Sequence, residues 1–215
     1  TTLSLAQSLY ERHKVLTSPR TASRALPEDY LATVKNTVAA LASGDLPAPM
    51  RDIKAHAAKA IKEGYIKPSK RVFDNAKVSD HFAIIPTLQT PTSLTEAELK
   101  LYDMVVKRFL AVFYPPAEFQ VTTRITQVVG HHFQTNGKVL VNPGWLAVYG
   151  RDAQEADATL VAVKASEKVS TDEVDAIALR TKPPPRYTEA TLLSAMEGAG
   201  KLIDDDDMRE AMQEK

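Results

Sequence analysis

Basic and hydroxyl side chains gather in the first half of the chain, in a pattern suited to contacting phosphate groups. Residues 1–116 hold 16 Lys and Arg against 11 Asp and Glu, whereas residues 117–215 hold 11 against 16. Such an asymmetry is a reason to look for a polyanion site in the basic half, although an excess of five over 116 residues could equally be a solvated surface with no partner. The hydroxyls of Thr21 and Ser23 could donate hydrogen bonds to phosphate. A track for a polyanion backbone, half of which could equally be solvated surface, would comprise Lys14, Arg24, Arg51, Lys54, Lys59 and Lys62.

Other residue types exclude several chemistries. The 215 residues include no Cys, which removes disulfides, thiol nucleophiles and zinc ribbons and favours a reducing cytoplasm. His131 and His132 are adjacent, so on a strand they would point to opposite faces and could not easily chelate one metal. We expect the acidic run at 204–207 to be a solvated segment. No apolar run is long enough to cross a membrane, and we expect no membrane partner.

The elements that must position these residues are helical in the first half. Apolar residues at helical spacing predict helices over 1–11, 27–43 and 49–63, the last two ending at Gly44 and Gly64. The first helix begins without a preceding cap. The clearest helix follows the capping box formed by Thr95 and Glu98 and ends before the prolines at 115–116.

The second half changes to the pattern of strands. Alternation over 119–125 predicts a strand, and Asn136-Gly137 predicts the turn of a hairpin. A further strand is predicted over 159–163, and a short helical turn over 171–175. The proline-rich stretch at 182–185 predicts a stiff linker, followed by a helix that carries Leu192, Leu193 and Met196. The fold class is therefore α+β. Helical patterns at both ends, over 1–11 and 207–215, suggest a piece of a larger protein.

Four segments of the chain resemble the type IA DNA topoisomerases, with topoisomerase III the most alike. Residues 9–24 read LYERHKVLTSPRTASR, where the family has Leu-Tyr-Glu and then Thr-Tyr-Pro-Arg-Thr-Asp-Ser. Residues 79–87 read SDHFAIIPT, similar to the family's His-x-Ala-Ile-x-Pro-Thr. Residues 101–116 and 185–192 resemble two later segments, and all four occur in family order.

The resemblance implies three parts of the fold and a set of partners. These are a helical gate domain at 1–116, a β-rich hinge domain at 117–182 and the start of a helical base domain at 183–215. The Toprim domain, which binds the family's Mg²⁺, and the C-terminal region would lie outside this chain, on which we expect no metal. The implied partner is single-stranded DNA, and the implied location is cytoplasmic and associated with a bacterial nucleoid.

The reaction that the resemblance implies is the ATP-independent breakage and rejoining of one DNA strand. A tyrosine attacks the strand and becomes joined to its 5′ phosphate, another strand passes, and the break is resealed. Ser18 stands at the tyrosine position, and Ala22 stands where the family has an aspartate. Serine is shorter by an aromatic ring, and its alkoxide is a poorer leaving group than a phenolate, so we expect this chain to be inactive alone.

The remaining site residues are expected to contact DNA. The resemblance implies that Arg20 touches the scissile phosphate and stabilises its developing negative charge. It also implies that His81 hydrogen-bonds a phosphate. Together with these two, the predicted DNA-binding residues are Lys14, Thr21, Ser23 and Arg24. We expect Trp145 to be a packing residue.

Three readings of function stay open at this point. The chain is part of a topoisomerase with a defective nucleophile, a non-catalytic module that binds single-stranded DNA, or a decayed reading frame. The retained Arg20 and His81 and the basic helix surface motivate the second, and the sequence does not separate the second from the third.

Overall fold

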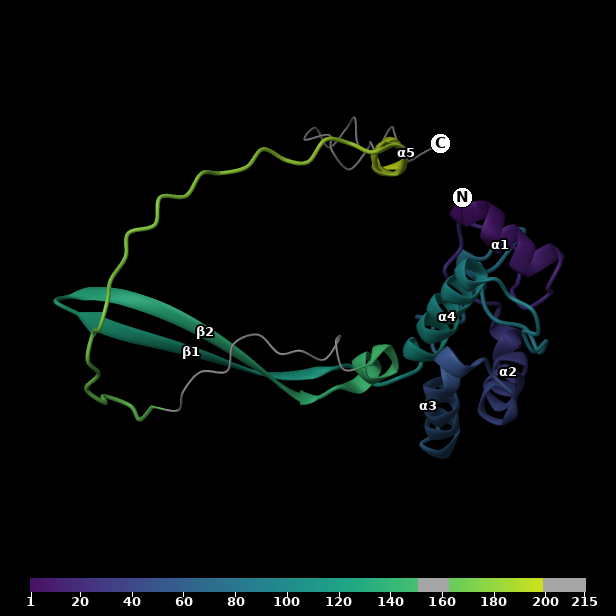
Figure 1. Ribbon diagram of the computed structural model, residues 1–215, viewed down its shortest axis with the longest axis horizontal. Coiled ribbons are helices and arrows are strands. Elements are labelled where there is room, and N and C mark those ends of the chain that lie inside the picture. Colours follow the sequence, from purple (N-terminus) through teal and green to yellow (C-terminus); the bar gives the residue numbers. More distant parts are fainter. Residues whose placement is uncertain (151–162, 199–215) are drawn as a thin grey trace. The chain divides into compact units, whose positions relative to one another are not determined.

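The computed structural model describes residues 1–150 and 163–198 (Figure 1). The chain divides into two compact units, residues 1–162 and residues 163–215. The described part of the first unit contains four α-helices and a two-stranded antiparallel sheet. The described part of the second unit contains a single α-helix as its regular element. This mixture agrees with the predicted α+β class, while the three predicted domains and their bounds stay predictions.

The four helices of the first unit lie where the apolar spacing predicts them. They are α1 (Thr2–Glu11), α2 (Leu31–Ser43), α3 (Arg51–Lys62) and α4 (Glu96–Ala111). Short 3₁₀ turns precede two of them, at Glu28–Tyr30 and Ala48–Met50. The expectation that α1 lacks a cap is wrong, because the Thr1 hydroxyl accepts a hydrogen bond from the Ser4 amide.

Glycine ends the third helix in the expected way. Gly64 adopts a φ of 64° directly after α3. The Gly64 amide donates to the Ile61 carbonyl at 3.1 Å, and the Tyr65 amide donates to the Ala60 carbonyl at 2.9 Å. This pair of bonds is the Schellman motif, which satisfies carbonyl groups that the helix end would otherwise leave without donors.

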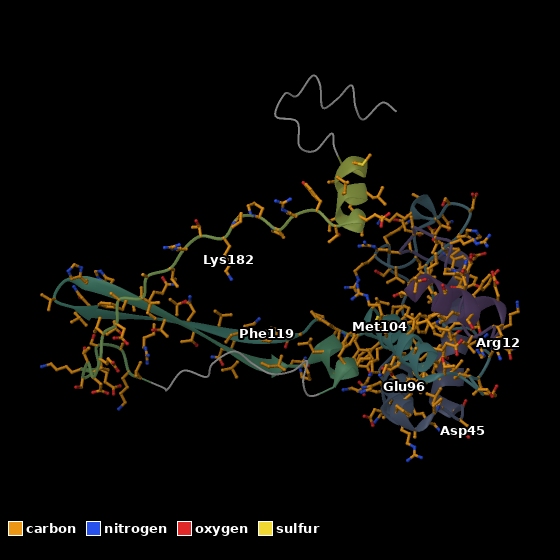
Figure 2. All side chains as sticks on the ribbon, turned by 45° about the horizontal axis from the view of Figure 1, so that its top comes forward. Arg12, Asp45, Glu96, Met104, Phe119 and Lys182 are labelled. Atoms are coloured by element: carbon orange, nitrogen blue, oxygen red, sulfur yellow. The ribbon has the colours of Figure 1, made fainter. Side chains whose placement is uncertain are left out.

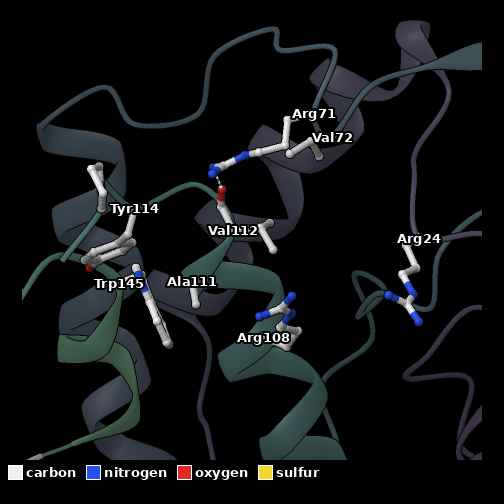
Figure 3. Close-up of a pocket in the computed structure, with 9 residues that line it drawn as sticks. Arg24, Arg71, Val72, Arg108, Ala111, Val112, Tyr114 and Trp145 are labelled. Carbon is white, nitrogen blue, oxygen red and sulfur yellow. Dashed lines mark hydrogen bonds between the residues drawn. The ribbon is translucent and has the colours of Figure 1, made fainter. Parts of the chain in front are cut away.

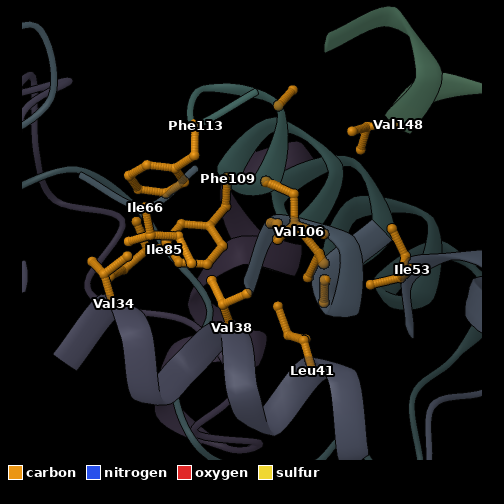
Figure 4. Packing of buried hydrophobic residues seen from close by; sticks show 14 of the residues in the cluster. Val34, Val38, Leu41, Ile53, Ile66, Ile85, Val106, Phe109, Phe113 and Val148 are labelled. Carbon is orange, nitrogen blue, oxygen red and sulfur yellow. The ribbon is translucent and has the colours of Figure 1, made fainter. Parts of the chain in front are cut away.

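One apolar core joins the helices of the first unit. Val34, Val38 and Leu41 project from one face of α2 towards Phe109 and its neighbours on α4 (Figure 4). Each fully buried aliphatic side chain contributes about 1.5–3 kcal/mol relative to exposure. Because segments before α2 and between α3 and α4 also enter this core, it fixes the loops as well as the helices.

A buried carboxylate connects the start of α4 to α1. Glu98 is only 5% exposed, and its side chain accepts hydrogen bonds from the Thr95 amide at 2.9 Å and the Thr95 hydroxyl at 2.8 Å. It also accepts one from the Ser8 hydroxyl of α1 at 2.6 Å. His13 Nε2 lies 3.3 Å from the same carboxylate, without hydrogen-bond geometry. The bonds from Ser8 and Thr95 lower the pKa of Glu98 to about 2.

The antiparallel hairpin follows the end of α4. Strand β1 (Glu118–Val128) pairs with β2 (His131–Asn142) over its whole length, and most of its side chains are exposed. Phe119, labelled in Figure 2, lies near the start of β1. The ammonium group of Lys138 lies over its ring, 3.8 Å from the ring centre. The strand predicted over 119–125 is confirmed, as is the strand position of His131 and His132, both exposed.

The predicted hairpin turn at Asn136-Gly137 is wrong. The turn is Val129-Gly130, with φ values of 48° and 80°, and Asn136 pairs with Thr123 within the ladder. A turn at 136–137 would leave only a short returning strand before Pro143, which cannot donate to a ladder. The longer pairing therefore outweighs the stronger local turn signal.

A short 3₁₀ helix at Gly144–Tyr149 returns the chain to the end of α4. Gly144 has a φ of 47°, and a Cβ there would meet the Pro116 carbonyl oxygen at 2.2 Å, so only glycine fits. The Trp145 amide donates to the Pro115 carbonyl at 2.9 Å. This close approach determines where Trp145 lies.

The described part of the second unit is mostly irregular. Residues 163–188 form no helix or strand, so the helical turn predicted over 171–175 is wrong. Helix α5 (Glu189–Glu197) is confirmed, with Thr188 and Thr191 forming its capping box. Its predicted apolar residues are exposed in this unit, namely Leu192, Leu193 and Met196.

Three predictions concern chain outside the described residues. They are the strand over 159–163, except for its last residue, the acidic run at 204–207, and the helix over 207–215. The last residue of the predicted strand, Val163, is described and is not in a strand. Among the helices that the structure describes, none has the length and apolar character needed to cross a membrane.

The contacts of Glu98 predict a loss of stability in acid. Because its pKa is lowered from 4.5 to about 2 by folding, its stabilising effect is present above pH 4.5 and is lost as the pH falls towards 2. Glu98→Gln keeps the shape but cannot titrate, so we expect a shallower decline in unfolding free energy across this range. Urea unfolding at several pH values measures it.

The matched control is Glu96→Gln on the same helix, where the carboxylate is exposed. This variant should follow the acid decline of the parent chain. Equal acid slopes for the parent and Glu98→Gln would contradict the role of the Glu98 carboxylate.

Candidate DNA-contacting surface

The two strongest sequence motifs lie side by side in the structure. Leu16 and Pro86 form an antiparallel bridge. On one side of it the Thr17 amide donates to the Ile85 carbonyl at 3.0 Å, and on the other the Thr87 amide donates to the Val15 carbonyl at 3.0 Å. Segments about seventy positions apart in the sequence therefore become one surface.

Two threonine hydroxyls that sequence reasoning did not single out hold this pairing. Thr17 Oγ1 donates to the Ala83 carbonyl at 3.1 Å and accepts from the Ile85 amide at 2.9 Å. Thr87 Oγ1 donates to the Lys14 carbonyl at 2.6 Å. Both threonines belong to the quoted motifs, yet the motif pattern does not distinguish structural hydroxyls from those that would touch a ligand.

Ser18 follows this pairing and is partly exposed. Its Oγ accepts a hydrogen bond of 3.3 Å from the Arg20 amide, which closes a small turn around Pro19. Within the described residues, no histidine or carboxylate bonds to this oxygen. Among the described residues, the Ser18 hydroxyl thus has no hydrogen-bonded base of the kind that activates a serine nucleophile.

Arg20 and His81 are both exposed beside the paired segments. Their segments touch where the Thr21 hydroxyl donates to the His81 carbonyl at 3.3 Å. In the part of the chain that the structure describes, the Arg20 guanidinium makes no hydrogen bond or ion pair. It thus keeps its five N–H donors for an outside anion.

The hydroxyl protons of Thr21 and Ser23 are directed to protein carbonyls. Thr21 donates to His81, and Ser23 donates to the Lys77 carbonyl at 2.6 Å. A hydroxyl has one proton, so these bonds compete with any donation to phosphate. Their observed effect is to hold the 18–24 loop on the loop before His81, and their predicted phosphate contacts stay predictions.

Lys14 lies within the motif and Arg24 ends it. Lys14 has a φ of 58° and its ammonium lies 5.7 Å from the ring centre of Tyr10. Arg24 is exposed at the edge of a cavity of about 460 Å³, which Arg108 of α4 also lines. Thr21, Ala22 and Ser23 line the same cavity, so the motif borders a concave, positively charged surface.

The remaining members of the predicted basic track belong to α3. Arg51, Lys59 and Lys62 are exposed, and Lys54 is partly exposed. Residues buried from the same helix, such as Ile53 and Ala57, face the core, so the basic residues occupy the opposite side. Among the described ion pairs none involves these four cations.

The described residues offer no donor set for the Mg²⁺ that the family resemblance implies. Over 1–150 and 163–198, no three His, Asp or Glu side chains gather closely enough to hold a metal ion. Mg²⁺ prefers several oxygen ligands in near-octahedral geometry, which a single exposed carboxylate does not supply.

The structure also reveals cationic and aromatic residues that the motifs do not contain. Arg71, Arg108 and Trp145 line a second cavity next to the first (Figure 3). Trp145 packs edge-on against Tyr149, as expected of a packing residue, but it is 38% exposed. These three residues come from separate segments, and no local sequence signal brings them together.

The two bonds of Thr17 predict the effect of removing its hydroxyl. Thr17→Val keeps the shape but leaves the Ile85 amide and Ala83 carbonyl without this partner, so we expect a loss of about 1–3 kcal/mol in unfolding free energy. Thr17→Ser retains both bonds and should lose far less. Urea denaturation of the two variants measures the difference, and equal losses would contradict the role of the hydroxyl.

Comparison with known proteins places this surface in a family. A family model described as DNA topoisomerase matches residues 1–200. Proteins named DNA topoisomerase 3 from Bacillus licheniformis and Bacillus subtilis are each 39% identical, over 209 and 212 residues. One from Bacillus cereus is 38% identical over 212 residues. Each alignment covers 94% of this chain and 28% of the relative, so the chain spans just over a quarter of the length of these relatives.

The match agrees with the order and content of the motifs whose pairing forms the surface. It extends over both paired segments and continues through the hairpin into α5. The chain therefore belongs to the type IA DNA topoisomerases and is similar to topoisomerase III.

Proposed function

We propose that this chain holds single-stranded DNA at the strand-breakage site of a type IA topoisomerase, and that Ser18 does not act as the nucleophile. The observation that supports DNA contact most directly is the pairing of residues 14–17 with residues 83–87. It brings the Arg20 loop and the His81 segment together while leaving the Arg20 guanidinium free of partners among the described residues.

Arg20 and His81 have the chemistry for this role. A guanidinium can form two parallel hydrogen bonds to one phosphate, with geometry that a lysine cannot reproduce. His81, whose carbonyl accepts from Thr21, adds a ring N–H donor beside this loop. Lys14 and Arg24, which precede and follow Arg20 in the same motif, are also exposed, and several cations favour a strand rather than a single small anion.

The same geometry supports an inactive nucleophile position. The Ser18 hydroxyl is partly exposed, accepts from the Arg20 amide and has no bonded base among the described residues. A serine Oγ also lies closer to the backbone than a tyrosine oxygen by the length of a ring. Since reaction rates fall steeply when the attacking atom is misplaced, a phosphate seated for tyrosine would be out of reach.

Strand binding is tested with a labelled oligonucleotide. The full chain should bind single-stranded DNA with an affinity that falls steeply as salt rises. Arg20→Gln should weaken binding about tenfold at low salt through loss of a charge-assisted contact, measured by fluorescence anisotropy. Lys70→Gln is the matched control, since Lys70 is already paired with Glu28 and should bind like the parent. No binding at low salt, or no effect of Arg20→Gln, would overturn this part of the proposal.

The inactivity of Ser18 is tested by looking for a covalent product. We expect no DNA-linked protein after incubation of the chain with single-stranded DNA and Mg²⁺, on a denaturing gel and by intact-mass measurement. We also expect no relaxation of supercoiled DNA by the chain alone. A 5′-phosphoryl adduct mapped to Ser18 would overturn the assignment, whatever the binding experiment shows.

A further inference from the structure

A second cavity, of about 350 Å³, lies where the end of α4 meets the 3₁₀ helix that follows the hairpin. Four segments surround it: the end of the 18–24 loop, the loop after α3, the last turn of α4 with the residues that follow it, and the start of the 3₁₀ helix. Figure 3 shows Arg24, Arg71 and Arg108 around it, with Trp145 and Tyr114 beyond Ala111. We name it the Arg–Trp cleft after the three arginines and Trp145.

The Arg–Trp cleft has positive charge without a matching carboxylate. No Asp or Glu lines it, and none of its arginines forms an ion pair within the described residues. Three like charges that line one cavity repel one another. An anion in the cleft would remove this repulsion.

Arg71 is held in place for such a contact. Its Nη2 donates to the Val112 carbonyl at the C-terminal end of α4, at 2.6 Å (Figure 3). Carbonyls at a helix end lack intrahelical partners and carry partial negative charge, so this bond fixes the guanidinium. This bond uses one of the five N–H donors, and the others stay available for phosphate oxygens.

Trp145 supplies an aromatic ring at the same cleft. Its backbone is fixed by the bond from its amide to Pro115 and by the close approach of Gly144 to Pro116. Its side chain contacts Tyr149 edge-on, with ring centres 5.7 Å apart, and still has 38% of its surface exposed. An indole held this way is a stacking platform for a nucleobase, whatever the base sequence.

Tyr114 contributes a neutral wall. Its hydroxyl donates to the His56 carbonyl at 2.8 Å. Burial raises the pKa of Tyr114 to about 12, and the nearby Tyr65 is a second, smaller cause of this increase. The phenol therefore brings no negative charge to compete with a bound phosphate.

The cleft adjoins the surface that contains the motif. Arg24 and Arg108 line both this cleft and the cavity beside Thr21 and Ser23, as do Val72 and Val112. A strand leaving the Arg20 loop past Thr21 and Ser23 would thus meet the guanidinium groups of Arg24 and Arg108. Its 350 Å³ falls in the range of ordinary ligand sites, about 300–1,000 Å³.

We propose that the Arg–Trp cleft binds the continuation of the single strand held at the Arg20 loop, with its arginines on phosphates and Trp145 stacked on a base. The proposal rests on the DNA binding proposed above and adds three residues to it, Arg71, Arg108 and Trp145. It also predicts that a nucleotide, rather than inorganic phosphate, is the preferred occupant.

The single tryptophan of the chain makes the stacking directly observable. Titration of the full chain with an oligothymidylate of about eight nucleotides, a length suited to one binding groove, should quench the fluorescence of Trp145. An abasic oligonucleotide of equal length and charge should bind without comparable quenching. Inorganic phosphate at matched ionic strength should leave the emission unchanged.

Variants separate the charge and the ring, read out with a fluorescein-labelled oligonucleotide. Trp145→Leu should weaken binding about tenfold, and Trp145→Phe should weaken it less because a smaller ring still stacks. Arg108→Gln should weaken binding about fivefold and reduce the steepness of the salt dependence by about one phosphate contact. Lys35→Gln is the matched control, because Lys35 is exposed on α2 and does not line the cleft. Thermal unfolding confirms that each variant is folded.

The outcomes distinguish the two proposals. If Arg20→Gln weakens binding but Trp145 is not quenched and Arg108→Gln binds like Lys35→Gln, the cleft assignment is overturned while DNA binding at the Arg20 loop stands. Equal quenching by the abasic strand, or quenching by phosphate alone, would likewise overturn the stacking. If no DNA binds at low salt, both proposals fail.

Discussion

The surface depends on one short antiparallel pairing, between residues 14–17 and residues 83–87. Two amide bonds and the hydroxyls of Thr17 and Thr87 form it, and Leu16 and Pro86 are buried at its centre. α1 is anchored on one side by the Ser8 bond to Glu98, and Ala83 bonds to Ala25 on the other. Both ends of the loop that contains Ser18 and Arg20 are therefore held by hydrogen bonds to other segments. The backbone of this loop is thus ordered before a ligand binds, so binding at Arg20 costs only the rotamer freedom of its unpartnered side chain.

Sequence patterns predicted the helices well, because local and tertiary preferences agree there. In α4, Thr95 and Glu98 cap the helix, and Tyr102, Val106 and Phe109 fall on its buried face. At the hairpin these preferences conflict. Asn136-Gly137 is the better isolated turn, but the pairing of all of β1 places Gly137 inside the ladder opposite Thr122. A local rule cannot weigh the bonds of a partner strand whose length is set by Pro143.

The candidate site was predictable to the extent that it lies in contiguous motifs. Residues 9–24 and 79–87 carry the signature, and the structure brings them together. The Arg–Trp cleft was not predictable in this way, because Arg71, Arg108 and Trp145 lie on three elements and belong to no shared pattern. The sequence alone also could not assign Thr21 and Ser23, whose hydroxyls serve the loop by donating to His81 and Lys77.

The backbone at Lys14 has a consequence for how this surface would change under selection. A φ of 58° is a conformation that asparagine or glycine adopts at lower cost than lysine, by about 1 kcal/mol or more. Its carbonyl is fixed there by the Thr87 hydroxyl, so the chain cannot relax by turning the peptide. Lysine at this position thus costs backbone conformational energy, and it places a cation near the ring of Tyr10 within the motif. Selection for thermal stability alone should therefore replace this lysine, whereas selection for affinity for a polyanion should retain it.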